Sequence, residues 1–224
     1  MKFGSLLLAF LLPALAAGTT ITFVVPSGTT VNGLPVSGFA TVTTGMGQMD
    51  IHLVNLQDNP KSVIQGFNGV SFVLPEGLAA TGILFGSAEA VNIASDGSYT
   101  SLGDISIGWV LDSSGLMVGM LLPGGSGPAQ LLLGGPDSEG IYSDANGSIA
   151  GNNPHNPFLK EGLDLTLSVP GMTPDTEVLG STIYFGTASG QGVPLESSAP
   201  EPVSLTLSGV GLAGLAFLRL KRRE

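Results

Sequence analysis

The chain has 224 residues, of which 7 are Lys or Arg and 17 are Asp or Glu, so its formal net charge is -10. An acidic chain does not attract polyanions, so nucleic acid is excluded as an expected partner. Because 43% of the residues are hydrophobic, an intrinsically disordered acidic chain is excluded as well. The 34 glycines and 15 prolines favour short strands joined by turns over long helices, and the length fits one domain.

The charges are distributed unevenly along the chain. Five of the seven cations lie near the two ends, and only Lys61 and Lys160 lie between residues 17 and 199. These two cations face fifteen acids, so the middle of the chain carries a formal charge of -13. We therefore expect the ends and the middle to serve different purposes.

The N-terminus has the order of a secretory signal peptide. Lys2 precedes an apolar run over residues 3–12, and small residues follow at 14–17. The pattern predicts a signal peptide over residues 1–16 with cleavage after Ala16; a buried first helix is the alternative. The apolar run is too short to span a bilayer core of about 30 Å. The chain has no cysteine, so the exported domain has to be stable without disulfides.

The C-terminus combines a short motif, an apolar run and a basic cluster. Pro200, Glu201 and Pro202 precede a predicted transmembrane helix over residues 203–220, and the basic tail covers residues 219–224. The basic residues are Arg219, Lys221, Arg222 and Arg223. By the positive-inside rule they place this end in the cytoplasm, so residues 19–196 would lie beyond the inner membrane.

Glycines in the apolar run also fit a dinucleotide-binding pattern. Gly209, Gly211 and Gly214 have the G-x-G-x-x-G spacing, but only ten residues follow before the chain ends. A dinucleotide site needs a complete βαβ unit of about thirty residues. We therefore expect small residues of a membrane helix here, and no cofactor.

The tail over residues 200–224 resembles the PEP-CTERM sorting signal of bacterial proteins associated with exopolysaccharide. The resemblance implies an exported protein of a Gram-negative bacterium. It also implies a transient partner, a membrane-embedded, cysteine-dependent transpeptidase called exosortase. This enzyme is thought to act near the Pro-Glu-Pro motif and to release the domain to the cell surface or extracellular matrix. The interior resembles, more loosely, uncharacterised ectodomains that accompany this tail, through residues 49–56, 59–65 and 155–158 and residues 184–187. No activity comes with that resemblance.

Several interior segments alternate apolar and polar residues with the period of two that a half-buried strand requires. Leu163, Leu165 and Leu167, for example, share one face, while Asp164 and Thr166 share the other. The predicted strands cover residues 20–25, 39–43, 49–53, 70–74, 83–93, 105–109, 163–169 and 182–186. We therefore predict a mainly β fold, with a single β-sandwich-like ectodomain over residues 17–187.

The remaining segments are predicted to be a helix, turns, loops and a linker. Asn59 and Pro60 suit the cap and first position of one short helix that includes residues 62–65. Asn-Gly pairs that begin at Asn32, Asn68 and Asn146 suit tight turns. Two short strands with long loops are expected over residues 115–153. The Gly, Pro and Ser residues of 188–199 predict a flexible linker.

Residues that could carry chemistry are sparse, and we nominate no catalytic residue, cofactor or metal ligand. His52 is expected to be exposed beside Asp50, and His155 to make a hydrogen bond within its loop. The acidic loops 137–140 and 144–147 could offer oxygen ligands to calcium, but Asp and Asn beside Gly are also typical of solvated turns.

Three classes of function remain. The first is a surface or extracellular-matrix structural protein associated with exopolysaccharide. The alternative is a polysaccharide-binding module, which predicts a row of exposed aromatic side chains; Trp109, however, alternates with isoleucines as a core residue would. An enzyme acting on glycans would need a cleft that holds two acids at catalytic separation, and we do not expect one.

Overall fold

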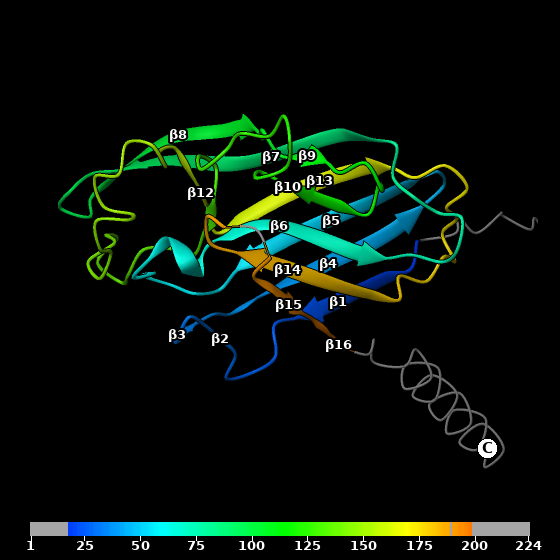
Figure 1. Ribbon diagram of the computed structural model, residues 1–224, viewed down its shortest axis with the longest axis horizontal. Helices are drawn as coiled ribbons and strands as arrows, with labels where there is room; N and C mark the ends of the chain where they lie inside the picture. The colour runs from blue at the N-terminus through cyan, green and yellow to red at the C-terminus, as the bar shows by residue number, and fades with distance from the viewer. Residues whose placement is uncertain (1–17, 189, 199–224) are drawn as a thin grey trace, which may run out of the picture.

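The computed structural model describes residues 18–188 and 190–198 (Figure 1). The signal peptide over residues 1–16, the motif Pro200, Glu201 and Pro202, the transmembrane helix over residues 203–220 and the basic tail lie outside the described residues. Within the described part of the chain, no helix combines the length and apolar character needed to cross a membrane.

The expected mainly β fold is confirmed, because strands make up nearly all of the regular structure. The first half of the chain forms β1 (Thr20–Val24), β2 (Thr30–Val31), β3 (Leu34–Pro35), β4 (Gly38–Gly45), β5 (Gln48–Asn55), β6 (Phe67–Val73), β7 (Gly82–Ile93) and β8 (Tyr99–Ser106). The second half forms β9 (Val110–Leu111), β10 (Met117–Gly119), β11 (Leu132–Leu133), β12 (Phe158–Lys160), β13 (Gly162–Ser168), β14 (Gly180–Phe185), β15 (Gly192–Pro194) and β16 (Glu196–Ser198). A 3-10 turn, η1 (Val63–Gln65), is the helical element of the described residues.

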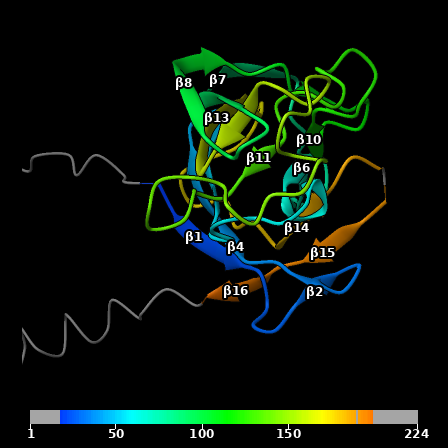
Figure 2. The ribbon, with the colours of Figure 1, turned by 90° about the vertical axis from the view of Figure 1, so that its left-hand side faces the viewer.

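One large sheet folds over into two facing layers (Figure 2). The first layer has the order β8-β7-β13-β5-β4-β1-β16, and the second consists of β9, β10, β6, β14 and β15. The short strands β11 and β12 join the layers, because β11 pairs with β6, β12 pairs with β7, and the two pair with each other in parallel.

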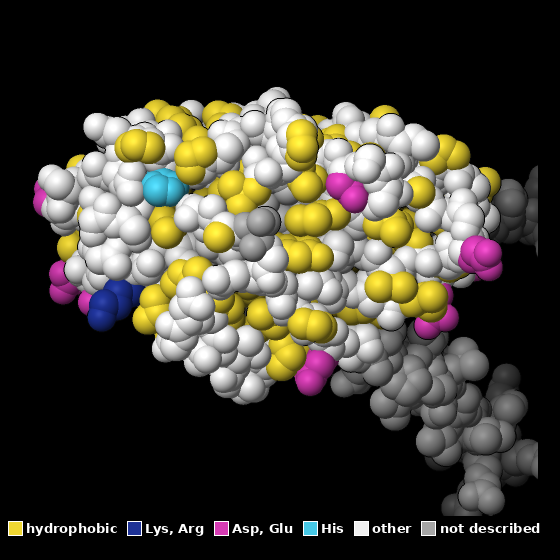
Figure 3. All heavy atoms as spheres, in the orientation of Figure 1, with side chains coloured by type: hydrophobic (Ala, Val, Ile, Leu, Met, Phe, Trp, Pro, Cys, Tyr) yellow, Lys and Arg dark blue, Asp and Glu magenta, His cyan; other side chains and the backbone are white. Residues whose placement is uncertain are grey.

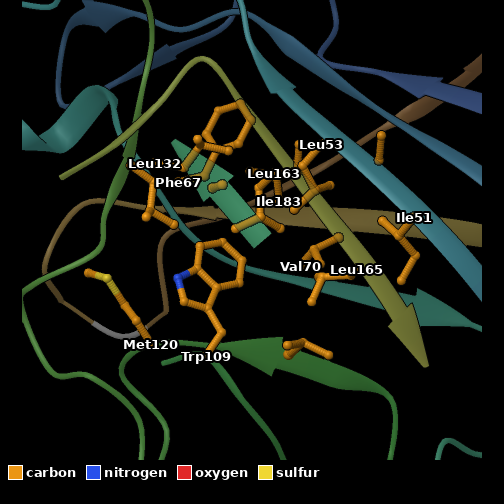
Figure 4. Close-up of a cluster of buried hydrophobic side chains, with 14 of the residues drawn as sticks. Ile51, Leu53, Phe67, Val70, Trp109, Met120, Leu132, Leu163, Leu165 and Ile183 are labelled. Atoms are coloured by element: carbon orange, nitrogen blue, oxygen red, sulfur yellow. The ribbon is translucent and has the colours of Figure 1, made fainter. Parts of the chain in front are cut away.

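The hydrophobic core lies between the layers (Figure 4). Ile51 and Leu165 point inward from the first layer and Val70 and Ile183 from the second, and all four are buried. Trp109 is buried as expected, and its Nε1 donates a hydrogen bond of 3.0 Å to the Gln130 carbonyl. The alternation of apolar and polar residues along each strand thus places apolar side chains on the inner faces of both layers.

The predicted strand over residues 105–109 is displaced along the chain, because β8 covers Tyr99–Ser106 and shares only residues 105 and 106 with it. Strand β8 ends at Ser106, and Trp109 lies between β8 and β9. The chain leaves β7 at this point because the Gly108 amide donates to the Gln130 side chain instead of to a neighbouring strand. Hydrogen bonds to the loop residue Gln130 thus replace the strand pairing that was expected at residues 108 and 109.

The short helix has a different cap from the predicted one. Ser62 is the N-cap of η1, and Gln65 completes a capping box by accepting hydrogen bonds from the amides of Lys61 and Ser62. Asn59 has a left-handed backbone, with φ of 48°, and its side-chain oxygen accepts from the Asp144 amide. Its side chain is thus engaged by a distant loop and does not cap the helix.

The Asn-Gly pairs have different roles. Asn32 and Gly33 both have positive φ, 50° and 78°, and join β2 to β3 as a tight turn. The turn predicted at Asn68 is wrong, because Asn68 is buried inside β6 and its side chain donates to the carbonyls of Phe185 and Gly186. The β6 strand can accommodate this amide because Phe185, the last residue of β14, and Gly186, which follows it, each offer a carbonyl acceptor. Residues 115–153 contain the two expected short strands, β10 and β11.

The predicted flexible linker contains two strands. We call residues 192–198 the strap: β15 pairs with β14 in one layer, and β16 pairs with β1 in the other. Leu195 joins the two strands, and its amide donates a hydrogen bond of 2.9 Å to the Ser181 carbonyl. The paired strands therefore continue to Ser198 and do not stop at residue 187, because β14 and β1, at one edge of each layer, accept strands from the same segment.

Truncating a core leucine should destabilise the domain strongly. Leu165 is 2% exposed, so we expect Leu165→Ala to lower the free energy of unfolding by about 2–5 kcal/mol through lost burial and a residual cavity. Leu84, on the adjacent β7, is 63% exposed, and Leu84→Ala should change that free energy by no more than about 0.5 kcal/mol. Denaturant unfolding of the two variants measures the difference. Equal losses would contradict the core described above.

Candidate functional site

The first layer carries a shallow hollow on its outward face, which we call the outer hollow. Its volume is about 270 Å³. Its outward-pointing side chains come from four adjacent strands: Thr41 and Thr43 of β4, Asp50 and His52 of β5, Asp164 and Thr166 of β13, and Phe85 of β7.

Strand register brings these side chains together. His52 lies opposite Thr41 on one side and Asp164 on the other. Asp50 likewise lies between Thr43 and Thr166, so two polar rows run across β4, β5 and β13. Because alternate residues of a strand share a face, the same alternation that fills the core produces these rows.

Hydrogen bonds fix the polar groups of the rows. His52 Nδ1 lies 2.7 Å from Asp164 Oδ1, with side-chain exposures of 47% and 63%. The Asp50 carboxylate accepts a hydrogen bond of 2.7 Å from the Thr166 hydroxyl and one of 3.1 Å from the side-chain amide of Gln48. Pairs this exposed contribute little to stability, so their main effect is to orient the side chains toward solvent.

Aromatic rings flank the polar rows. Phe85 is 55% exposed and lies opposite Thr166, and the Phe39 ring centroid lies 6.4 Å from that of His52. Hydroxyl, carboxylate and imidazole groups beside the exposed Phe85 ring and the half-buried Phe39 ring form a surface that can hydrogen-bond a hydroxyl-rich molecule and cover its apolar faces. The face of the molecule seen in Figure 3 has mainly apolar and uncharged polar atoms, with few charged side chains.

His52 is exposed, as expected, but its hydrogen-bond partner is Asp164 and not Asp50. The two partners are 112 residues apart in the chain. The alternation of β13 places Asp164 on an outward face, but nothing in the sequence specifies that β13 pairs with β5. The outer hollow therefore could not be assembled from the sequence.

His155 makes the expected hydrogen bond within its loop through its backbone amide, which donates to the Asn152 carbonyl over 3.1 Å, but its ring does not make one through Nδ1. The His155 Nδ1 atom is buried and has no hydrogen-bond partner, and the ring stacks on Phe158 with centroids 6.2 Å apart. Burial lowers the pKa of His155, because desolvation disfavours the charged imidazolium. The His155 ring is therefore positioned by its stacking on Phe158, a buried core residue.

The acidic loops form hydrogen-bonded turns. The Asp137 carboxylate accepts hydrogen bonds from the amides of Glu139 and Ile141 and from the Ser143 hydroxyl. The hydrogen bond from Ser143, followed by that from Ile141, lowers the pKa of Asp137. Over residues 18–188 and 190–198, no group of three or more His, Cys, Asp or Glu side chains is arranged to hold a metal ion.

A half-buried ion pair joins β7 to β12. Lys160 Nζ lies 2.9 Å from Glu89 Oε2 and 5.2 Å from the centroid of the Tyr99 ring. Hydrogen bonds from Ser101 and then Lys160 lower the pKa of Glu89. Burial acts to lower the pKa of Lys160, but the Glu89 carboxylate outweighs it and raises that pKa. Glu89 and Lys160 are far apart in the chain, so the sequence alone did not predict this ion pair.

A scan against protein-family models found no match, and searches of curated proteins and of solved structures found no significant match.

The half-buried imidazole of His155 predicts a loss of stability in mild acid. The unfolded chain has a His pKa near 6.5, above that of folded His155, so it binds more protons as the pH falls through this range. The contribution of His155 is therefore complete above pH of about 6.5 and is lost below it. We expect His155→Phe to flatten the dependence of unfolding free energy on pH between about 7.5 and 5.5. Urea unfolding across this window measures the slope; a variant slope equal to that of the wild type would refute the assignment.

Proposed function

We propose that the protein is an exported structural protein of the cell surface or extracellular matrix of a Gram-negative bacterium, associated with exopolysaccharide and sorted through a PEP-CTERM signal. The observation that carries this proposal is how the folded domain fits between the two terminal signals. The first paired strand begins at Thr20, a few residues after the predicted signal peptide, and the last ends at Ser198, two residues before Pro200.

In this proposal each terminal segment has one task. The signal peptide over residues 1–16 directs export. The helix over residues 203–220 holds an intermediate in the inner membrane, with Arg219, Lys221, Arg222 and Arg223 in the cytoplasm. An exosortase-type transpeptidase then acts near Pro200, Glu201 and Pro202. The β-sandwich-like domain is released without the helix.

Replacing the acid of the motif should block processing. We expect Glu201→Ala to accumulate as a full-length, membrane-retained form if the enzyme recognises the motif by its chemistry. Intact mass and fractionation into membrane, supernatant and matrix measure this. Glu177→Ala is the matched control, because Glu177 is an exposed acid of the loop between β13 and β14, outside both β16 and the motif. Normal release of Glu201→Ala would mean that another protease acts.

A polysaccharide-binding module is the second candidate, and the outer hollow favours it. Sugar rings present hydroxyl groups at their edges and apolar C–H groups on their faces. The polar rows supply partners for the hydroxyl groups, and Phe85, which lies opposite Thr166, supplies an exposed ring. This candidate function rests on one exposed ring, that of Phe85, beside polar groups. A row of exposed aromatic side chains was expected for a polysaccharide-binding module.

Truncating the hollow should weaken polysaccharide binding. We expect Phe85→Ala and Asp164→Ala each to raise the dissociation constant for host exopolysaccharide about tenfold, equivalent to about 1.4 kcal/mol. Leu84→Ala and Asp104→Ala are matched controls, because both side chains are exposed and neither lines the hollow. Co-sedimentation with purified exopolysaccharide measures the affinity. If all four variants bind like the wild type, the outer hollow is not the binding site.

A further inference from the structure

The strap ends where the sorting motif begins. Ser198 is the last paired residue of β16, opposite Thr22 of β1, and its hydroxyl donates a hydrogen bond of 3.0 Å to the Thr22 carbonyl. Pro200 is two residues further on. A chain spans at most about 3.6 Å per residue, so two residues of chain can separate the Cα atoms of Ser198 and Pro200 by no more than roughly 7 Å.

An enzyme that cuts a peptide near Pro200 needs residues upstream of the cut as well as the motif itself. Peptide-binding sites commonly hold an extended segment through its backbone N–H and C=O groups, as a sheet edge holds an added strand. Here the upstream residues are Glu196, Ser197 and Ser198, which pair with Val24, Phe23 and Thr22 of β1. The domain and the enzyme therefore compete for the same segment.

We propose that β16 is a recognition segment shared between β1 and the processing enzyme, and that it must separate from β1 before the chain is cut. This inference rests on the proposed function, because it requires processing near residues 200–202. The partner it fits is a membrane-embedded peptidase or transpeptidase with an extended substrate groove.

In this proposal β16 separates from β1 while the rest of the strap stays in place. All three β16 residues are exposed, so separating them from β1 uncovers little apolar surface. Opening can stop at Leu195, whose amide is held by the Ser181 carbonyl, while β15 stays paired with β14. The two layers remain closed, and β16 can pair with β1 again after the cut.

A disulfide across β1 and β16 tests the proposal directly, because the chain has no cysteine of its own. Thr22 and Ser198 face each other in antiparallel register, which places their Cα atoms at a separation a disulfide can bridge. In the full-length protein expressed in its host, we expect the oxidised Thr22→Cys/Ser198→Cys variant to stay unprocessed. Reductant added to the medium should restore processing.

Two controls separate strap opening from other effects. Thr20→Cys/Thr43→Cys ties β1 to β4 on the same outward face, where the two hydroxyl oxygens lie 2.9 Å apart, and should be processed normally. Thr22→Cys alone should also be processed normally, because it introduces a thiol in β1 without tying the strap and leaves β16 unchanged. Intact mass establishes both the disulfide and the extent of processing.

The outcomes are distinct. If the disulfide-bonded strap is cut as readily as the β1–β4 control, β16 need not open and the proposal is overturned. If both disulfide variants resist processing, any cross-link to β1 blocks processing, whether or not it holds the strap, and the proposal is again overturned. If the wild type is not processed, or Glu201→Ala is processed like the wild type, the proposed sorting function fails first, independently of the strap.

Discussion

Apolar contact between two layers of one sheet holds this molecule together. The inner faces of β5 and β13 meet those of β6 and β14, and buried side chains such as Leu165 and Ile183 fill the space between them. The chain has no cysteine, so no disulfide supports this contact. Each strand that builds the core also sets an outward row, so the core determines the register of the polar groups on the outer faces of these strands.

The open edges of the sheet are the second constraint. An unpaired strand edge exposes backbone donors and acceptors that can pair with another chain. The strap places β15 on β14 and β16 on β1 with a single residue between them, so one segment covers an edge in each layer. The last paired residue, Ser198, precedes Pro200 by two positions in the sequence. Sheet closure and the proposed processing would therefore involve the same seven residues.

Sequence reasoning located the strands and the core because alternation is local. It placed Trp109 in the core and Leu163, Leu165 and Leu167 on one buried face, and the structure agrees. It could not find the outer hollow, because the contact of His52 with Asp164 depends on a pairing between strands that are distant in the chain.

The strap was missed for a different reason. Gly, Pro and Ser are typical of linkers, and only the free edges of β14 and β1 give residues 192–198 their strand conformation. Asn68 shows the same limit: its Asn-Gly sequence is typical of a turn, but the carbonyls of Phe185 and Gly186 hold its amide inside β6. Local composition therefore predicts an element poorly where distant partners decide the conformation.

The ion pair of Lys160 has a consequence for how long such a domain would survive outside a cell. Between residues 17 and 199 the chain has only two basic residues that proteases of tryptic specificity could recognise, Lys61 and Lys160. Lys160 lies within a strand, bound to Glu89, with 14% of its side chain exposed. Lys61 is exposed, but its amide and that of Ser62, which follows it, are both held by Gln65. The folded domain therefore offers such a protease almost no extended basic site, a property well suited to an environment rich in secreted hydrolases.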